Sequence, residues 1–529
     1  MKQIVSIVLV VILVTGMIAA CAPANQAPPA PSPDTPAATP ATADAPPPPV
    51  AAVASGSLVV ATVADPPAVT VARHNSIAAS NINRMTHNGL FRICYQTLDP
   101  IPDIAESYRA ISDVEWEFRL REGILFHNGE EVTAEDLYAS FTYARQHPEG
   151  LGNLASVVSF EVVDRYTFRV NTGTPNALLL FDLAQQANFV QPASLIESGH
   201  DFISDPVGSG PYRFVEWDVG NSISVTAFDD YFDEARAARI RDITWRIIPE
   251  GASRTIALEA GEIDFIIEVA TPDVPRLQAD PNVTVDMRVG TAHHFLILNN
   301  ENPLFYNNIP LRQAIDMAID KEAIVFAAFD GLATPTWNQV STSFPGVSNE
   351  GMNTFDPAGA RTLLAEHNID PSIITFEIIA SDDQARRVAE IIQANVADIG
   401  LSANITMVDL ATRLAVTNTP DFDTAVGSFT SNSLLWYLNG VFHSRSIGAS
   451  SRNRINSPEL DVLIDRTIGE LDPERRLAAF EDVTRRLNEI TPQIPLLQPY
   501  AIRAFNSRLI APELDAVGQL NVNMMYWVN

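Results

Sequence analysis

The segment of residues 114–141, VEWEFRLREGILFHNGEEVTAEDLYASF, changes its hydrophobic period twice and restricts the possible folds more than any other part of the chain. From 115 to 121 charged and apolar residues alternate, which predicts a half-buried strand. The His-Asn-Gly sequence at 127–129 is typical of a turn. Thr133 and Asp136 resemble a capping box, and apolar residues follow at helical spacing. The segment therefore predicts a strand, a turn and a capped helix.

Other segments repeat this mixture of periods without a fixed repeat. Runs of β-branched and aromatic residues predict strands at 57–63, 167–170, 223–228 and 243–250. Proline or serine and aspartate starts, with glycine stops, predict a helix of about eight residues ending at Gly261, helices at 310–330 and 383–399, and helices from Pro458 and Pro473 onward. The chain is predicted to be an α/β protein with several domains.

Composition excludes one class of partner. The chain has 529 residues with 64 acidic and 34 basic side chains, a formal charge of −30, and Lys2 and Lys321 as its lysines. Because a nucleic-acid backbone requires a basic surface, we expect no nucleic-acid partner.

The N-terminus resembles an export signal. Lys2 precedes an apolar run at 4–14, and small residues lead to Cys21, so residues 1–20 are predicted to be a signal peptide. The sequence before Cys21 resembles a bacterial lipobox, which implies lipid attachment at Cys21 and an extracytoplasmic protein held at a membrane. An uncleaved anchor helix is the alternative, although the apolar run is short for a span.

Residues 21–55 consist almost wholly of Ala, Pro, Thr, Asp and Ser, a composition typical of a disordered tether. Cys94 is the second of two cysteines, and its apolar surroundings favour a buried, inert thiol.

The search for catalytic patterns finds none that is specific. The chain contains no H-E-x-x-H, G-x-S-x-G or C-x-x-C pattern, and the glycine-rich run at 206–212 lacks the residues of a P-loop. His293 and His294 are adjacent at the start of an apolar run, which favours a strand end with one His facing a cleft or interface over metal ligation. We therefore expect neither an enzyme, nor a cofactor, nor a bound metal.

The stretch DIAESYRAISDVEWEFRLREGILFHNGEEVTAEDLYASFTYAR resembles the signature of the family 5 extracellular solute-binding proteins of ABC importers. Later blocks resemble that family in the same order, namely VGSGPYRF, the helix with R-x-x-A-L-x-x-G-E-x-D spacing, and LRQAIDMAIDKEAI. The resemblance covers roughly residues 57–529.

This resemblance implies an α/β fold of the bilobal periplasmic-binding-protein type (venus-flytrap, type II or cluster C) with an extra domain. Domain I is expected at 57–95, 205–290 and 500–529, domain II at 96–204, and domain III at 291–499. A peptide or other small organic solute would bind between domains I and III, and the monomeric protein would deliver it to an ABC permease. Delivery to a sensing receptor is the alternative. The 114–141 segment is scaffold in this family.

The charged anchors of peptide-binding relatives are not found where the resemblance places them. Residues 381–384 read Ser-Asp-Asp-Gln instead of supplying an arginine, and the loop expected at 430–437 has no carboxylate. An uncharged ligand, such as an oligosaccharide or a capped or longer peptide, is therefore expected. The candidate ligand-binding residues are Ser431, Asn432, Trp436, Tyr437, Trp337, His294, His74 and Asn75; packing roles for Trp436, Tyr437 and Trp337 remain open.

Overall fold

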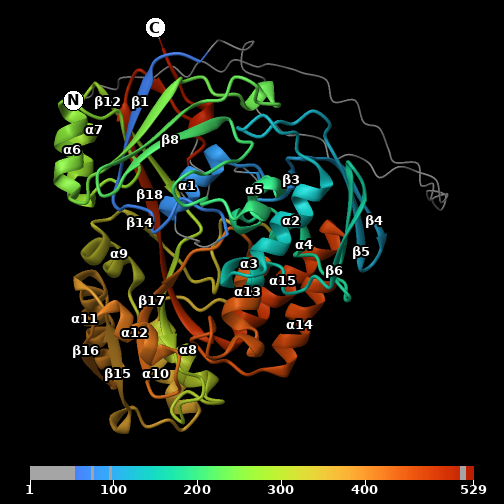
Figure 1. The fold of residues 1–529 in the computed structure, drawn as a ribbon. Coiled ribbons are helices and arrows are strands. Elements are labelled where there is room, and N and C mark those ends of the chain that lie inside the picture. Colours follow the sequence, from blue (N-terminus) through green and yellow to red (C-terminus); the bar gives the residue numbers. More distant parts are fainter. Residues whose placement is uncertain (1–53, 73–76, 95–97, 513–519, 529) are drawn as a thin grey trace, which may run out of the picture. The chain divides into compact units, whose positions relative to one another are not determined.

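The computed structural model describes residues 54–72, 77–94, 98–512 and 520–528. In these residues twelve strands form one hydrogen-bonded sheet, with the order β16-β15-β17-β13-β18-β11-β1-β10-β9-β8 and with β12 and β14 also pairing to β18. Figure 1 shows the strands of this sheet in two groups, blue and green strands at the top and yellow and orange strands at the bottom.

The sheet consists of two parts that share β18 (Gln493–Asn506). The part here called sheet A contains β1 (Ser57–Thr62), β8 (Tyr212–Asp218), β9 (Ser222–Ala227), β10 (Asp242–Ile247), β11 (Phe265–Ile266) and β12 (Val283–Val289). The part called sheet B contains β13 (His293–Leu298), β14 (Ala333–Pro335), β15 (Thr375–Ala380), β16 (Ser402–Met407) and β17 (Thr424–Phe429).

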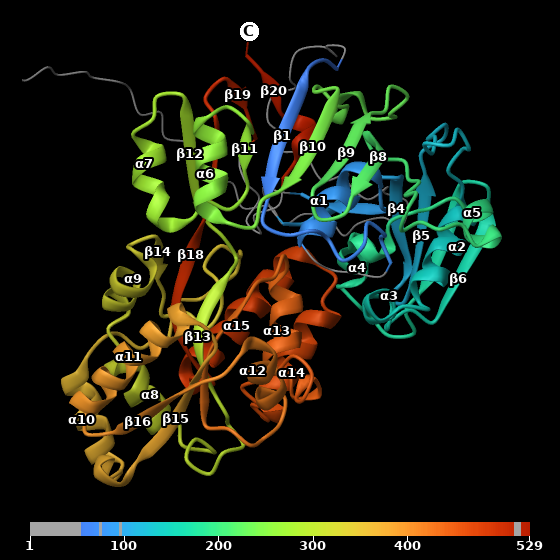
Figure 2. The same cartoon turned by 60° about the vertical axis from the view of Figure 1, so that its left-hand side comes forward.

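Strand β18 changes partners along its length. Its residues 493–497 pair with β13, while residues 500–506 pair with β12 in the antiparallel sense. Between them, residues 497–499 pair with β14. Figure 2 shows β18 leaving the β13 side and continuing beside β12. The chain crosses between the two parts a second time through residues 290–292, which link β12 to β13.

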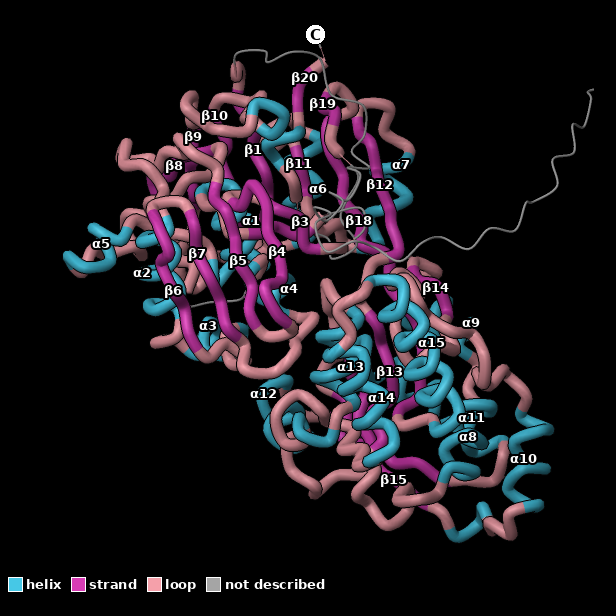
Figure 3. The backbone as a smooth tube through the Cα atoms, turned by 90° about the vertical axis from the view of Figure 1, so that its right-hand side faces the viewer, coloured by secondary structure: helices cyan, strands magenta, loops and turns pink. Residues whose placement is uncertain are grey.

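A separate four-stranded sheet, here called sheet C, has the order β4-β5-β7-β6 and contains the first part of the 114–141 segment. Its strands are β4 (Ala105–Ser112), β5 (Glu115–Leu120), β6 (Ser159–Asp164) and β7 (Thr167–Asn171). Two short pairs complete the strands, β2 (Phe91–Ile93) with β3 (Pro100–Pro102), and β19 (Leu509–Ile510) with β20 (Tyr526–Trp527). Figure 3 shows sheet C with its neighbouring helices.

The helices have the following bounds: α1 (Ile77–Thr86), α2 (Ala134–Ala144), α3 (Pro148–Asn153), α4 (Leu179–Leu183), α5 (Ala193–Ser198), α6 (Gly251–Glu259), α7 (Val274–Gln278), α8 (Ile309–Ala318), α9 (Lys321–Phe329), α10 (Pro357–Glu366), α11 (Asp383–Asp398), α12 (Leu410–Thr417), α13 (Leu434–Phe442), α14 (Pro458–Gly469) and α15 (Pro473–Ile490). Apolar side chains of α8 to α11 cover one face of sheet B, and Val416 of α12 packs on the other. Side chains of α13 to α15 form one apolar cluster with those of sheet C, α2 and α4.

The predicted strand, turn and capped helix at 114–141 are confirmed as β5, a turn and α2. The Asp136 carboxylate accepts hydrogen bonds from the backbone N–H and the hydroxyl of Thr133, both at 2.8 Å. Its second oxygen accepts from the backbone N–H of Ala193 at 2.8 Å, which fixes α2 against α5. Asp136 thereby stabilises the helix start that the sequence indicated.

The turn of this segment attaches it to the glycine-rich run at 206–212. The His127 N–H donates to the carbonyl of Gly208 at 2.8 Å, and His127 Nε2 lies 3.0 Å from the carbonyl oxygen of Gly210. A Cβ at either glycine would overlap backbone atoms at the end of α1. The glycines are therefore needed for close backbone packing, and the segment acts as scaffold.

The predicted helix starts and stops are mostly confirmed. Ser457 and Asp472 accept hydrogen bonds from the first turns of α14 and α15, each with a proline at the first position. Helix α11 ends at Asp398 and is followed by Gly400 in the left-handed region, with φ of +91°.

The single helix predicted at 310–330 is wrong, because the structure has two. Helix α8 ends at Ala318, Ile319 adopts extended backbone angles, and the Asp320 side chain accepts from the Ala323 N–H at 2.9 Å to begin α9. A capping aspartate inside a continuous apolar pattern is a local signal that the periodicity concealed.

Cys94 is a buried free cysteine, and within the described ranges no helix is long and apolar enough to cross a membrane.

Candidate functional site

The ends of three strands gather several predicted site residues at one edge of sheet B. Strands β15 and β17 are parallel and end at Ala380 and Phe429, while the antiparallel β13 begins there, with His293 opposite Phe429. The residues that follow β15 and β17 and precede β13 therefore meet at this edge. In α/β proteins such strand ends are common positions for ligand sites.

A small pocket of about 40 Å³ lies beside this edge on the α12 side of sheet B. Strands β13 and β17, helices α12 and α13, the segment around residue 450 and the start of β18 contribute its lining. The lining residues are Phe295, Ile297, Arg413, Leu414, Ser428, Phe429, Val441, Ser450, Arg452, Asn453 and Gln493.

Arg413 and Arg452 are the charged residues of this pocket. Within the described residues neither guanidinium forms a hydrogen bond or an ion pair, and the Nε atoms of both are buried without a partner. Burial lowers the pKa of both arginines, and the charge of Arg452 lowers the pKa of Arg413 further. Asp382 acts on Arg413 only electrostatically. Two positively charged side chains thus share a partly buried pocket without an acidic residue in an ion pair with either of them.

Sequence reasoning missed this pair. Arg413 lies on α12 and Arg452 in a segment between α13 and α14, and no spacing rule relates two positions so far apart in the chain. The sequence offers a signal only in its composition. A chain with many more acidic than basic residues could readily pair its arginines, so an arginine without an acidic partner is unexpected.

The residues expected in a loop at 430–437 form a loop followed by the first turn of a helix. Helix α13 begins at Leu434, and the Ser433 hydroxyl accepts from the Trp436 N–H at 3.2 Å. Ser431 is buried and donates to the Ser433 carbonyl at 2.9 Å, while Asn432 is half-buried. The serine at the cap position explains why the helix starts within the predicted loop.

Trp436 and Tyr437 point to different surroundings. Trp436 is partly exposed, with 37% relative accessibility, and its indole lies near the carboxyl group of Asp182 on α4 and lowers the pKa of that group. Tyr437 is fully buried; its hydroxyl lies 3.3 Å from His293 Nδ1, and burial raises its pKa. In this structure Trp436 exposes surface to solvent, whereas Tyr437 exposes none.

The two adjacent histidines lie on opposite faces of β13, as predicted for a strand. Burial is the first cause that lowers the pKa of His293 to about 3 and that of His294 to about 4, so both are neutral at pH 7. The His294 ring packs edge-on against Phe329 of α9, with 5.2 Å between ring centres.

The remaining predicted residues are scattered. Trp337 is half-buried with its ring 5.4 Å from the ammonium of Lys321, away from the lining of the arginine pocket. Asp382 accepts from the Ala385 N–H at 2.8 Å and so caps α11, which gives the 381–384 segment a structural role. His74, Asn75 and Cys21 lie outside the described residues.

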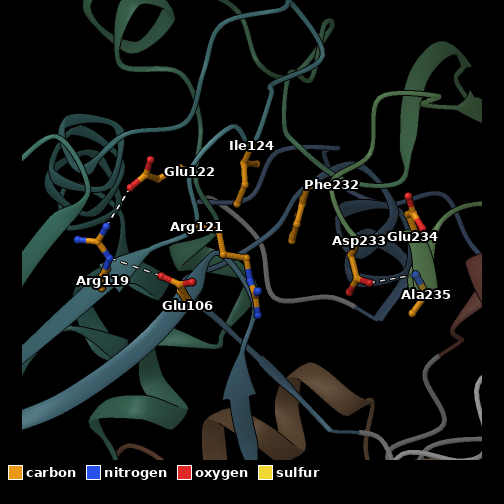
Figure 4. Close-up of a pocket in the computed structure, with 9 residues that line it drawn as sticks. All are labelled: Glu106, Arg119, Arg121, Glu122, Ile124, Phe232, Asp233, Glu234 and Ala235. Carbon is orange, nitrogen blue, oxygen red and sulfur yellow. Dashed lines mark hydrogen bonds and ion pairs between the residues drawn. The ribbon is translucent and has the colours of Figure 1, made fainter.

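A larger pocket of about 680 Å³ lies between sheet C and the segment at 232–235 (Figure 4). Several of its charges are compensated locally. Arg119 pairs with Glu122 at 2.9 Å and with Glu106 at 3.5 Å, and the Asp233 carboxylate accepts from the Ala235 N–H. This pocket therefore offers weaker evidence for a charged ligand than the arginine pocket does.

The described residues contain no group of three His, Cys, Asp or Glu side chains placed to hold a metal ion. The arginine pocket contains no side chain suited to be a nucleophile or general base next to a paired acid. Its chemistry is that of binding an anionic group.

Comparison with known proteins identifies the family of the chain. Residues 99–447 match the family model for bacterial extracellular solute-binding proteins, family 5 Middle. Heme-binding protein A of Haemophilus influenzae is 25% identical over 471 residues, covering 81% of this chain and 84% of the relative. Glutathione-binding protein GsiB of Pectobacterium atrosepticum is 25% identical over 452 residues, covering 82% and 87%.

A solved structure, HbpA2 from Haemophilus parasuis, superimposes with a TM-score of 0.82 at 23% identity and covers 90% of this chain and 100% of that one. The predicted periplasmic-binding-protein fold is thereby confirmed. The members of the matched family are proteins that bind solutes and are not enzymes. The chain belongs to the family 5 bacterial extracellular solute-binding proteins, the binding components of ABC importers.

Proposed function

We propose that this protein captures a peptide-like or other small organic solute between two lobes and delivers it to a membrane permease. The observation that carries the proposal is β18, a single strand that pairs with β13 over one half and with β12 over the other. Two lobes joined by this strand and by residues 290–292 can rotate about a narrow connection.

The boundaries of the two lobes follow from the point at which β18 changes its partner from β13 to β12. We assign residues 57–95, 205–290 and 500–529 to domain I, residues 96–204 to domain II, and residues 291–499 to domain III. The carbonyl of Gly290 supports the assignment of the hinge, because it accepts from the Ser343 hydroxyl at 3.1 Å and from Gln498 Nε2 at 3.2 Å. These bonds tie both connections together.

Two contacts join domains II and III in this structure. The Ala177 N–H, just before α4, donates to the Ile468 carbonyl of α14 at 2.7 Å, and Trp436 reaches Asp182 nearby. A ligand can favour closure only by binding the closed form more tightly than the open form.

The proposed ligand-binding residues are Ser431, Asn432, Trp436 and His294 at the edge of sheet B, the buried Tyr437, Trp337 beside Lys321, and His74 and Asn75. The relatives that bind heme and glutathione support a small organic ligand, and glutathione is a tripeptide. The partly exposed Trp436 ring would also suit stacking against a sugar, so an oligosaccharide is the second candidate.

We further propose that residues 1–20 direct export, that Cys21 carries a lipid and that residues 21–55 tether the monomeric binding unit to the membrane. The sequence pattern described above supports this. Cys21→Ser, expressed in a bacterial host, should be released from the membrane fraction while the wild-type chain is retained. Retention of the variant would contradict lipid attachment.

The experiment that tests the function is a thermal-shift and calorimetric screen of the full-length chain against free peptides, glutathione, heme and oligosaccharides. A ligand at 100 times its dissociation constant adds about 2.7 kcal/mol to the stability. Trp436→Ala should lower the affinity for the best ligand at least about tenfold, whereas the exposed Val462→Ala on α14 should leave it unchanged. Absence of binding in every ligand class would contradict the proposal.

A further inference from the structure

We propose that Arg413 and Arg452 form a subsite for a carboxylate-sized anionic group of the ligand, at the pocket beside the end of β17. The proposal rests on the solute-binding function above and names a chemical property of the solute. It replaces the uncharged ligand expected from the sequence. The reason is that two arginine side chains, which can bind an anion, meet at positions that no motif marked.

The first argument is the missing counter-charge. The chain has 64 acidic residues for 34 basic ones, and many described arginines form ion pairs, for example Arg169 with Glu117 at 2.8 Å. In the same chain Arg413 and Arg452 share a pocket without a bonded carboxylate. An unpaired charge with little solvent access is costly unless a partner arrives.

The nearest acidic influence does not fill this role. Asp382 attracts Arg413 electrostatically, yet no ion pair joins them, and one Asp382 oxygen accepts from the Ala385 N–H to cap α11. Arg413 retains only 9% of its accessible surface. Its Nε therefore remains a free donor inside the protein.

The second argument is the size and composition of the pocket. Its volume of about 40 Å³ suits a carboxylate-sized group and is far below the roughly 300–1,000 Å³ that enclose a whole ligand. Arginine guanidinium groups bind carboxylates through paired, charge-assisted hydrogen bonds.

The third argument is location. Ser428 and Phe429 line the pocket, and the chain continues from them directly through Ser431 to Trp436. A solute placed along this segment can contact Trp436 with its body while an acidic terminus enters the pocket. The arginine pair thus explains how a site without the expected anchors holds a charged end.

Acetate, the simplest carboxylate, is the direct probe. We expect acetate to raise the melting temperature of the ligand-free, full-length protein relative to chloride at equal ionic strength. Arg413→Gln and Arg452→Gln should each lower acetate affinity by about 10- to 100-fold, the range for a lost charge-assisted pair. Arg387→Gln, an exposed arginine on α11, is the matched control and should respond as the wild type does.

Lysine variants keep the test decisive if a glutamine variant does not fold. Arg413→Lys and Arg452→Lys retain the charge but lose the paired donors, so acetate should bind with intermediate affinity. No acetate effect on the wild-type protein, or an equal effect in all variants, overturns the subsite.

Trialanine and trialanine amide separate this proposal from the solute-binding function. The subsite predicts that the free carboxylate form binds more tightly than the amide, and that Arg413→Gln removes the difference. If both peptides bind equally to all variants, peptide binding stands and the subsite is wrong. If acetate binds through the arginines but no solute binds, the subsite stands and the proposed function is wrong.

Discussion

The indole of Trp436, on α13, lies close enough to the carboxyl group of Asp182, on α4, to lower the pKa of that carboxyl group, and α4 belongs to the part of the chain that carries sheet C. Asp182 is buried, and burial raises the pKa of its carboxyl group well above its usual value, while the indole partly offsets this. A residue predicted to bind ligand thus also joins two segments that are 254 positions apart in the chain.

Asp182→Asn should stabilise the protein at pH 7 to 8. A raised pKa means that the folded state binds more protons than the unfolded chain above the ordinary pKa near 4, so wild-type stability decreases as the pH rises from there through the folded pKa. The neutral amide removes this loss. We expect an increase of about 1 kcal/mol, or ~2 °C in melting temperature, that disappears near pH 4. Urea unfolding at both pH values measures it, and an equal difference at both would contradict the assignment.

Two buried histidines and two half-buried ones should make the fold sensitive to acid. Burial is the first cause that lowers the pKa of His87 and His293 to about 3 and that of His127 and His294 to about 4. The unfolded chain therefore takes up protons near pH 6.5 that the folded protein does not. Stability is complete above that pH and falls below it, by up to roughly 1.4 kcal/mol per pH unit for each histidine.

The His294→Gln variant isolates one of these groups. Its unfolding free energy should fall less steeply between pH 6.5 and 4 than that of the wild type. The difference in slope should be up to about 1.4 kcal/mol per pH unit. Guanidinium unfolding across this range provides the slope. An unchanged slope would mean that His294 is accessible to protons in the folded protein.

Lys321 and Asp316 form a buried ion pair that should control the stability of the α8–α9 junction. Their side-chain atoms lie 2.8 Å apart, and Asn353 donates to the other Asp316 oxygen at 2.8 Å. Lys321→Met leaves a buried carboxylate without its cation and should cost about 3–5 kcal/mol in unfolding free energy. The double variant Lys321→Met/Asp316→Leu should recover most of this loss. A double variant as unstable as the single one would contradict the argument.

Removing an unpaired arginine should stabilise the ligand-free protein. Arg413 is partly buried beside Arg452, so Arg413→Gln relieves both desolvation and repulsion. We expect the free energy of unfolding to increase by about 1 kcal/mol, because residues that serve a functional site often lower the stability of the protein. Arg387→Gln should change stability by less than about 0.5 kcal/mol. A loss of stability in Arg413→Gln would assign the arginine a structural role.

Local chemistry could be predicted from the sequence wherever one short segment contains its own partners. The capping aspartates and serines, the prolines at first helical positions and Gly400 act on backbone groups within a few residues, and the structure confirms them. The junction between α8 and α9 was missed because Asp320 interrupts a continuous apolar pattern. Periodicity records which face is buried and does not record where the backbone bends.

The sequence by itself determined the α/β class, the scaffold role of the 114–141 segment and the family. The tertiary structure was needed to show which candidates are accessible, because it buries Tyr437 and leaves Trp436 partly exposed. It also brought Arg413 and Arg452 together without a counter-charge. The physical reason is that capping and strand alternation depend on near neighbours, whereas burial and charge balance depend on residues that only folding brings into contact.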